Sequence, residues 1–441
     1  MNTLHNGMTP RLKPISARKS ATLSVLDIGT SKVVCIVAEL QPWEGVETLR
    51  RRTHLARVIG IGHHRSQGLK GGAVIDLEAA ESSIRQAVHA AERMAKVEIQ
   101  SVILTLSGGR LGSQHFEAEV SVRGGPVGES DLHRVLRLAG TEGVDQDRIA
   151  LHALPTGFVL DQQKNIADPT GMIGEKLGVD LHVVSAQAAA TRNLMLAVER
   201  CHLGVEAVVA APYAAGLSVL ADDEADMGAI VLDFGGGTTC FSVFEGGHLV
   251  HVDGFAVGGH HVTMDVARGL TTRVSAAERL KILHGSAVSS PADERDLFAA
   301  PQVDEDERDV ANHLPKSHLV RIVKPRIEEI LELARDRLSA VGFTPHPGRR
   351  LVLTGGASQL SGLPEQAGRI LEGQVRIGRP LGIRGLPEAA KGPAFAASVG
   401  LLVYPQVAHA EFFDMRSSGF FAGTGTDGYI SRVGRWLRDS F

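Results

Sequence analysis

Residues 229–247, AIVLDFGGGTTCFSVFEGG, contain an apolar run that ends at Asp233 and continues directly into a turn of glycine and threonine. Residues 21–40, ATLSVLDIGTSKVVCIVAEL, have the same organisation: an apolar run ends at Asp27, small residues follow, and a second β-branched strand is predicted over residues 33–37. An internal repeat at this separation predicts two related domains, with one turn from each closing on a shared ligand.

The residue types in both turns suit a phosphate group. Glycine lets backbone N–H groups approach anionic oxygens closely, and serine and threonine hydroxyls add hydrogen-bond donors. Either turn alone is as typical of a plain β-hairpin, so the prediction of a nucleotide site rests on the pair. The residues expected to bind the nucleotide here are Asp27, Gly29, Thr30, Ser31, Lys32, Asp233, Gly235, Gly236, Gly237, Thr238 and Thr239.

The two aspartates indicate a metal ion beside the phosphates. Mg²⁺ keeps most of its waters and is usually shared between one or two carboxylates and the phosphates of a nucleotide. We therefore predict that Asp27 and Asp233 hold Mg²⁺, mainly through water.

A third segment, residues 349–371, reads RRLVLTGGASQLSGLPEQAGRIL. A strand is predicted over residues 351–354 and a helix from near Leu363, with Gly355, Gly356 and Ala357 between them. A glycine pair in this position lets an adenine or a ribose lie against the backbone. The chain contains neither GxxxxGK[ST] nor a GxGxxG that opens a helix, which argues against the P-loop and Rossmann classes.

Length and charge limit the classes of protein to which this chain can belong. The 441 residues predict two or more domains. The net charge of -4 gives no overall basic field, so nucleic acid is not an expected partner. No stretch approaches the roughly 20 apolar residues that span a bilayer, and residues 1–20 lack an apolar signal-peptide core. We expect those residues to form a flexible basic arm and the protein to be cytoplasmic.

Together, the two turns and the LTGG segment resemble the actin, Hsp70 and sugar-kinase superfamily. Within it, the chain resembles the FtsA family of bacterial actin-like cell-division proteins over nearly its whole length. The stretches that carry this resemblance are residues 60–95 (GIGHHRSQGLKGGAVIDLEAAESSIRQAVHAAERMA), 101–109 (SVILTLSGG), 196–205 (LAVERCHLGV), 277–285 (AERLKILHG), 374–386 (QVRIGRPLGIRGL), 398–404 (SVGLLVY) and 431–441 (SRVGRWLRDSF).

The resemblance implies an α/β fold of the actin-like ATPase type. Two duplicated RNase H-like domains would surround a nucleotide cleft, with an inserted subdomain called 1C and a C-terminal amphipathic helix. The implied boundaries are subdomain 1A at 21–96 and 181–225, 1C at 97–180 with strands near 101–106 and 116–122 and a helix from Ser130, 2A at 226–258 and 339–405, 2B at 259–338, and a flexible linker at 406–428.

The resemblance also implies which residues bind the adenosine and whether ATP is hydrolysed. Glu278 and Lys281 would contact the adenosine sugar and base, although a pair with this spacing is also typical of a solvated helix face. In the hydrolysing Hsp70 pattern a Glu-Pro begins the connecting helix, whereas Ala211 precedes Pro212 here. Since general-base help is typically worth about 10² to 10⁴-fold in rate, we predict tight ATP binding and at most slow hydrolysis. Gln187 could orient water or serve as a structural amide; no catalytic residue is assigned beyond it.

The last thirteen positions predict a membrane-targeting helix, residues 429–441. At 100° per residue one face is apolar and the other carries arginines, which suits a helix lying in the membrane interface rather than spanning it. Docking on the protein's own body is the alternative. The residues of the two faces are Tyr429, Ile430, Val433, Trp436, Leu437 and Phe441 on one side and Arg432, Arg435 and Arg438 on the other.

A single short helix binds weakly, so the resemblance and the tail lead to one functional expectation. Filaments that form with ATP would present many tails at once and attach firmly to the cytoplasmic face of the inner membrane. There the protein would anchor the FtsZ ring through the FtsZ C-terminal peptide and recruit later division proteins.

The FtsZ contact is expected on residues 316–331, KSHLVRIVKPRIEEIL, at Arg321, Lys324 and Arg326, although such a charge run is often only a solvated face. The alternatives for the whole chain are a small-molecule kinase of the superfamily and an actin-like adaptor of a pilus or secretion assembly.

Overall fold

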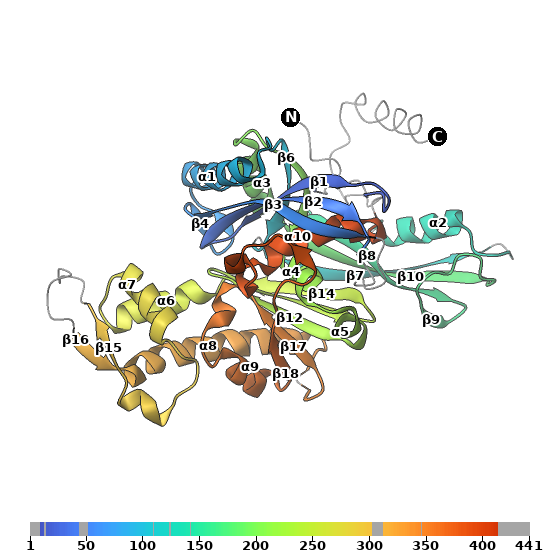
Figure 1. Ribbon diagram of the computed structural model, residues 1–441. Helices are drawn as coiled ribbons and strands as arrows, with labels where there is room; N and C mark the ends of the chain where they lie inside the picture. Colours follow the sequence, from blue (N-terminus) through green and yellow to red (C-terminus); the bar gives the residue numbers. More distant parts are fainter. Residues whose placement is uncertain are drawn as a thin grey trace.

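The computed structural model describes residues 9–12, 15–43, 52–108, 110–122, 125–141, 143–301, 312–344 and 346–412. Three sheets organise this part of the chain, and Figure 1 shows one above, one below and a third projecting to the side. The predicted tail helix, residues 429–441, lies outside the described residues.

The first sheet has the strand order β11-β6-β1-β2-β3-β19. Strands β1, β2 and β3 form an antiparallel meander, while β6 lies parallel to β1 and β11 parallel to β6. The bounds are β1 (Ala21–Ile28), β2 (Lys32–Pro42), β3 (His54–Arg65), β6 (Ser101–Leu106), β11 (Gly204–Ala210) and β19 (Ile383–Arg384), with the small hairpin β4 (Leu69–Lys70) and β5 (Ala73–Val74) beside it.

The second sheet repeats this topology. Its order is β14-β13-β12-β17-β18, in which β12, β13 and β14 form the antiparallel meander and β17 and β18 continue in parallel. The repeat that was predicted from residues 21–40 and 229–247 therefore extends to five strands in each half. The bounds are β12 (Ala229–Phe234), β13 (Thr239–Glu245), β14 (His248–Phe255), β17 (Arg350–Thr354) and β18 (Gln374–Ile377).

Two helices, α4 (Ala211–Val219) and α10 (Ala396–Val407), pack against each other between the two sheets (Figure 1). Both are built almost entirely from small and apolar residues, and nearly every side chain is buried. Their backbones approach so closely that a Cβ at Gly400 would collide with the backbone of Ala214. Tight packing of this kind fixes how the two halves face each other.

The remaining helices cover the outer faces. Helices α1 and α3 pack on the first sheet, and α6 to α9 enclose the core of the second half. The described elements are α1 (Leu77–Ala95), α3 (Ala188–Glu199), α5 (Asp222–Met227), α6 (Gly259–Gly269), α7 (Val274–His284), α8 (Lys316–Ala340) and α9 (Leu363–Leu371), with the short hairpin β15 (Leu297–Ala300) and β16 (Asn312–Pro315).

An insert, residues 112–187, forms the third sheet in the order β7-β10-β8-β9, all antiparallel. Alternate residues of these strands face α2 and build a separate apolar core with it. Figure 1 shows the insert extending away from the first half, and the bounds are β7 (Gly112–Ser121), α2 (Glu129–Ala139), β8 (Arg148–Leu160), β9 (Gln163–Ile166) and β10 (Lys176–Gln187).

In the structure, several of the subdomain boundaries lie at other residues than the resemblance implied. The strand at 101–106, assigned to 1C from the resemblance, is β6 of the first sheet, because it supplies the parallel fourth strand of that half. The insert instead runs on to Gln187, because β10 keeps pairing with β8 to its end. Within the expected 2A range, β19 returns to the first sheet and pairs with β3.

The ends of the chain also differ from the expected flexible arm and linker. The Thr9 amide donates to Ala150 O at 3.4 Å, and the Arg11 guanidinium donates to Phe412 O at 3.1 Å. Near them, His152 Nδ1 lies 2.9 Å from Glu411 Oε1, with both side chains buried. Segments before Ala21 and after residue 405 are therefore packed together on β8, and the predicted linker beyond residue 412 lies outside the described residues.

Candidate functional site

The two predicted turns face each other at the junction of the halves. In each turn the first glycine amide donates to a backbone oxygen three residues later: Gly29 to Lys32 O at 3.0 Å and Gly235 to Thr238 O at 2.9 Å. A Cβ at Gly237 would lie 2.5 Å from Thr30 Oγ1. The turns are thus alike in geometry and in direct contact, as expected from the repeat.

Asp27 at the end of β1 is held by two hydroxyl groups from distant parts of the chain. Thr105 Oγ1 donates to Asp27 Oδ1 at 2.6 Å, and Ser398 Oγ donates to Asp27 Oδ2 at 2.7 Å. Hydrogen bonds to an ionised group are stronger than those between neutral groups, so they fix this carboxylate in place. We did not predict either residue, because their positions in β6 and α10 give no local motif.

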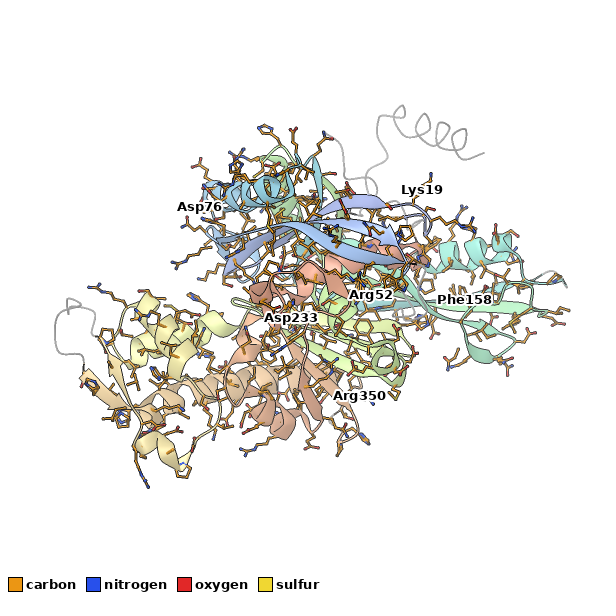
Figure 2. All side chains as sticks on the ribbon, in the orientation of Figure 1. Lys19, Arg52, Asp76, Phe158, Asp233 and Arg350 are labelled. Carbon is orange, nitrogen blue, oxygen red and sulfur yellow. The ribbon has the colours of Figure 1, made fainter. Side chains whose placement is uncertain are left out.

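Asp233 lies at the equivalent end of β12, where Figure 2 shows it between the upper and lower halves. Burial and the neighbouring charge of Asp27 raise the pKa of Asp233 to about 7, while Lys32 opposes the shift. A buried carboxylate that another carboxylate makes harder to ionise is stabilised by a neighbouring cation. The oxygen-rich donor set and the adjacent turns therefore fit Mg²⁺ shared with phosphate.

Lys32 completes the charged centre. Burial lowers the pKa of its ammonium group, against the attraction of Asp27 and Asp233. Its Nζ lies 3.4 Å from the centroid of the Phe395 ring, just before α10. A cation over an aromatic face is stabilised by the ring quadrupole, so Phe395 helps to orient Lys32. Phe395 is a third residue, after Thr105 and Ser398, that the sequence patterns did not reveal.

The glycine pair after β17 lies directly against Asp233. Gly355 has φ +84°, and a Cβ there would collide with Asp233 Oδ1 and with the backbone of Phe234. Only glycine both adopts this positive φ without strain and leaves room for the Asp233 carboxylate. Gly356 and Ala357 continue into a short 3₁₀ turn, so this predicted adenosine segment adjoins the second predicted phosphate turn.

Glu278 and Lys281 belong to this same region. Lys281 Nζ donates to Glu278 Oε2 at 2.8 Å, to Thr263 Oγ1 at 2.9 Å and to Gly259 O at 3.1 Å. Burial would raise the pKa of Glu278, but hydrogen bonds from Lys281 and Thr263 outweigh it and lower that pKa. The Lys281 side chain is only 12% exposed, so the pair is not a simple solvated helix face.

Gly259 connects that pair to the glycine segment. A Cβ at Gly259 would lie 2.8 Å from the Cβ of Ala357, and its amide donates to Gly235 O at 3.0 Å. Helix α6 therefore begins between the second turn, Ala357 and Lys281. The structure thus gathers the predicted phosphate, Mg²⁺ and adenosine residues into one continuous region.

Gln187 is not part of this region. It ends β10 and precedes α3, and its backbone oxygen accepts a hydrogen bond from Thr191 Oγ1 at 3.0 Å. Among the described residues no hydrogen bond joins its side chain to either aspartate or either turn. Ala211 is the first residue of α4 and is buried, so the connecting helix begins without a carboxylate at that position.

The three basic residues expected to meet a peptide lie on α8. Arg326 donates to Asp265 Oδ2 at 2.6 Å and also pairs with Glu329. Lys324 lies 3.8 Å from Glu328 Oε1. The Arg321 guanidinium contacts Ser317 O at 3.4 Å and Ser317 Oγ at 3.5 Å. Arg321 therefore has the least compensated charge of the three among the described contacts of this helix.

The described residues contain no cluster of three or more His, Cys, Asp or Glu side chains arranged to hold a metal ion. They also include no helix that is both long enough and apolar enough to cross a bilayer. The predicted membrane-facing residues from Tyr429 to Phe441 lie outside the described ranges.

Comparison with known proteins identifies the family. Residues 230–400 match the family model described as "Cell division protein FtsA", and residues 108–185 match "SHS2 domain inserted in FTSA". The second match corresponds closely to the insert at residues 112–187. It agrees with the structure in leaving β6 outside the inserted domain.

Relatives extend the similarity over the whole chain. "Cell division protein FtsA" of Rhizobium meliloti (strain 1021) is 53% identical over 98% of this chain and 98% of its own length. The protein of the same name from Agrobacterium fabrum is 52% identical over 99% of this chain and 98% of its own.

Among solved structures, one titled "PilM-PilN type IV pilus biogenesis complex" covers 87% of this chain and 98% of its own, with a TM-score of 0.59 and 16% identity. At that identity the likeness shows a shared fold only. The duplicated five-strand topology, the inserted domain and the identity over nearly the full length agree: this chain has the actin-like fold and belongs to the FtsA family of cell division proteins.

Proposed function

We propose that this protein binds ATP with Mg²⁺ between its two halves and, as an actin-like filament, anchors the division ring at the cytoplasmic face of the inner membrane. The observation that carries the nucleotide part is the meeting of the two turns with Asp27 and Asp233 at their base. Glycine turns of this kind offer backbone donors to phosphate, and the paired carboxylates attract a divalent cation.

Each part of the proposed site has a distinct task. Thr105 and Ser398 hold Asp27, while Gly355 leaves space for Asp233. Lys32 would pair with phosphate oxygens, and the Glu278–Lys281 pair beside Ala357 would meet the adenosine. A bound Mg²⁺ would neutralise phosphate charge, and with Ala211 in place of a carboxylate we expect hydrolysis to be slow.

The proposed subdomains follow the sheets and the insert. We assign 1A to the first sheet with α1 and α3, 1C to the insert, 2A to the second sheet and 2B to α6, α7, the β15–β16 hairpin and the start of α8. Because α4 and α10 cross between the sheets, a nucleotide that joins the two turns would favour one relative orientation of the halves. That orientation would be the one that assembles into a filament.

Partner contacts are proposed at two places. Arg321, with Lys324 and Arg326, would bind carboxylates of the FtsZ C-terminal peptide on α8, since Arg321 contacts only Ser317 among the side-chain contacts of the described residues. The tail with Trp436 would lie in an anionic membrane surface, and later division proteins would be recruited to the assembled filament. In peptide binding, Arg321→Ala should weaken affinity, while Arg335→Ala on the same helix, where Arg335 pairs with Asp336, should not.

Co-sedimentation with anionic vesicles tests the anchor. The wild-type protein should bind strongly with ATP·Mg²⁺ and weakly without nucleotide, since assembly multiplies weak tails. Trp436→Glu should abolish binding, and Trp436→Phe should preserve most of it. Retention of every protein in the supernatant, with ATP binding intact, would reject the anchor and favour an adaptor or kinase of the same fold.

A further inference from the structure

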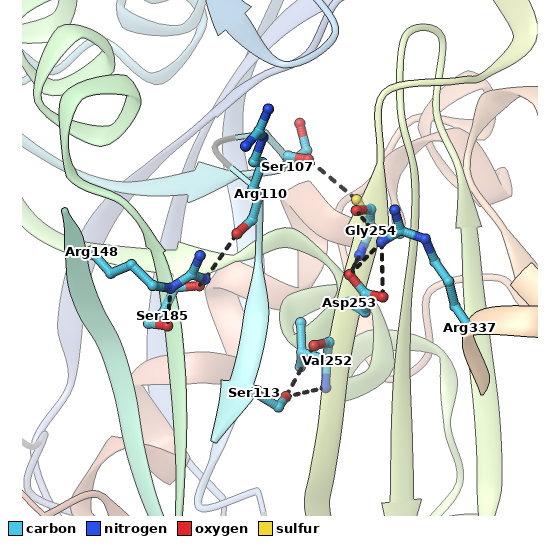
Figure 3. A network of polar contacts seen from close by, with 10 residues as sticks. Ser107, Arg110, Ser113, Arg148, Ser185, Val252, Asp253, Gly254 and Arg337 are labelled. Atoms are coloured by element: carbon cyan, nitrogen blue, oxygen red, sulfur yellow. Dashed lines mark hydrogen bonds and ion pairs between the residues drawn. The ribbon is translucent and has the colours of Figure 1, made fainter. Parts of the chain in front are cut away.

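The insert and the second half of the molecule meet along a seam between strands β7 and β14. Each strand is at the edge of its own sheet, so each has backbone groups that its own sheet does not pair. We define the seam by three side chains of the insert, Ser113, His115 and His182, and by the backbone of β14 that they contact. Figure 3 shows the Ser113 end of it beside Val252.

Ser113 takes the place of a strand partner for β14. Its hydroxyl oxygen accepts the Val252 amide at 2.6 Å and lies 3.0 Å from Val252 O. The same oxygen lies 2.8 Å from His182 Nε2. One hydroxyl proton serves either the Val252 carbonyl or the imidazole, so this serine links the backbone of β14 to His182.

His182 of β10 is a neutral member of the seam. Its Nδ1 lies 2.8 Å from Leu249 O, a carbonyl that can only accept, so Nδ1 carries the proton and Nε2 is free to accept from Ser113. Burial lowers the pKa of His182 to about 3. This imidazole therefore stays neutral across the physiological range.

His115 of β7 is in a different position, because both of its ring nitrogens face groups that only accept. Nδ1 lies 3.0 Å from Asp180 Oδ1, and Nε2 lies 2.9 Å from Val250 O. A neutral imidazole has one N–H and can satisfy only one of these partners. The geometry of both contacts together requires the doubly protonated form.

The groups around His115 agree with that form. Asp180, itself held by Thr156 Oγ1 at 2.9 Å, and Glu117 on the same strand are acidic. The ring of His182 stacks on His115 with centroids 4.8 Å apart, and His251 of β14 is the other nearby imidazole, its pKa lowered by burial. Helix α2 packs on the opposite face of β7, against Phe116 and its alternate neighbours.

The hydrogen bond to Asp180 raises the pKa of His115, although burial opposes the shift. A group whose pKa is raised by its contacts strengthens them fully below its ordinary value of 6.5 and loses them as pH rises through the raised value. The contact with Val250 therefore weakens as pH rises through that raised value.

The seam is connected to the candidate nucleotide site through the end of β14. The chain passes from Phe255 to Gly258 and Gly259, where the Gly259 and His260 amides donate to Gly235 O and Gly236 O at 3.0 and 2.7 Å. On the other side, Cys240 Sγ lies 3.2 Å from Ser107 O, next to the start of the insert. Movement of β14 would therefore displace the Gly259 and His260 amides that hold the second predicted phosphate turn.

From these contacts we propose that the seam is a protonation-controlled latch: the His115 imidazolium clamps β14 to the insert at Val250, and loss of its proton weakens that clamp and loosens the second turn. The latch concerns the free protein and does not depend on which nucleotide binds. The seam joins the inserted domain to the second half through side chains rather than through a β-ladder. The gain or loss of a single proton on one side chain can therefore change the strength of this contact.

Hydrogen exchange of the Val252 amide tests the latch in the nucleotide-free protein. After correction for the chemical exchange rate, protection should be high near pH 6 and fall about tenfold by pH 9, the loss expected for one charge-assisted hydrogen bond. The His260 amide should follow the same transition. Protection of the Val231 amide in the middle of β12 should not change, and it reports that the protein remains folded.

Two variants and a control make the test specific. His115→Gln should keep Val252 protection at every pH near the low level that the wild type reaches at pH 9, with no transition, and Asp180→Asn should move the transition to lower pH. His89→Gln, a change at an exposed histidine of α1, should behave as the wild type. A transition that persists in His115→Gln, or flat protection in the wild type, would overturn the proposal; a His260 amide that does not follow would reject its link to the turn.

Discussion

The carboxylates of Asp27 and Asp233 occupy equivalent positions in two halves of the same topology, yet the protein holds them differently. Asp27 accepts hydroxyl hydrogen bonds from Thr105 and Ser398 on its two oxygens. Asp233 lies against the backbone at Gly355, and no hydrogen bond to its side chain is present among the described residues.

This difference indicates a division of labour within the repeat. The first half supplies an anion whose geometry is fixed by donors from β6 and α10. The second half supplies a carboxylate that burial and Asp27 make costly to ionise, with a pKa of about 7. A cation that relieves this cost would bind the halves together, which is what an ATP·Mg²⁺ site between them requires.

The largest effect should come from removing the space beside Asp233. In Gly355→Ala the added methyl group collides with Asp233 Oδ1 and the backbone must keep φ +84°, so we expect a loss of about 2–5 kcal/mol in the free energy of unfolding. Chemical denaturation measures it. Gly356→Ala is the matched control, since its Cβ would lie 3.8 Å from Ala394 Cβ, an ordinary van der Waals contact. Equal stability of the two variants would contradict the tight contact.

A change at Asp233 itself should separate stability from function. Between the ordinary carboxyl pKa of 3.8 and the raised value of about 7, the folded state keeps a proton that the unfolded state has lost, so wild-type stability falls as pH rises through this window. Asp233→Asn should therefore be more stable than wild type at pH 8 without nucleotide or Mg²⁺, by about 0.5–2 kcal/mol.

The same Asp233→Asn variant should have a smaller advantage at pH 5, where the folded wild type keeps the carboxyl proton and only the unfolded state has lost it, and should bind ATP·Mg²⁺ at least tenfold more weakly. Thermal unfolding at the two pH values and calorimetric titration of ATP·Mg²⁺ give both readouts. A variant that is less stable than wild type at pH 8 would show that the pair is not electrostatically strained.

Loss of one hydroxyl donor should have a smaller effect in the first half. Ser398→Ala removes one of two hydrogen bonds to Asp27, each worth about 1.5–3 kcal/mol when the acceptor is charged. Because water can replace part of this, we expect ATP·Mg²⁺ affinity to fall about tenfold. Ser218→Ala in α4 removes another buried hydroxyl, bonded to Ala396 O, and should leave affinity unchanged. Similar losses in both would assign the effect to general packing.

The smallest effect concerns the orientation of Lys32. Phe395→Leu keeps an apolar side chain but removes the aromatic face under the ammonium group, worth about 0.5–1 kcal/mol at a partly exposed site. ATP·Mg²⁺ affinity should fall two- to fivefold, as measured by titration. Phe395→Tyr retains the ring and should restore it; failure to do so would point to packing alone.

Local sequence patterns were enough to predict the position of those site residues that lie next to one another in the chain. Both turns, their aspartates, the strand ending at Thr354 and the start of α9 at Leu363 are where their patterns indicate, since each depends on glycine chemistry and strand alternation within a few residues. The partners of Asp27 could not be found in this way, because Thr105 and Ser398 reach it from 78 and 371 residues away.

Boundaries between the parts were the weakest predictions, for a related reason. The segment 101–106 reads as a strand in any context, and only its parallel pairing with β1 assigns it to the first sheet. The segments near the two ends of the chain have loose, polar sequences, yet the Thr9 amide bonded to Ala150 O and the buried Glu411–His152 pair hold them to β8.

The duplicated glycine turns, the aspartate before each of them and the family could be read from the sequence, because these depend on residue identity and short-range order. Tertiary contacts were needed to show which strands form each half, how differently the two aspartates are held, and that His115 meets acceptors on both nitrogens. Those properties depend on distances between segments far apart in the chain, and packing sets such distances after local structure has formed.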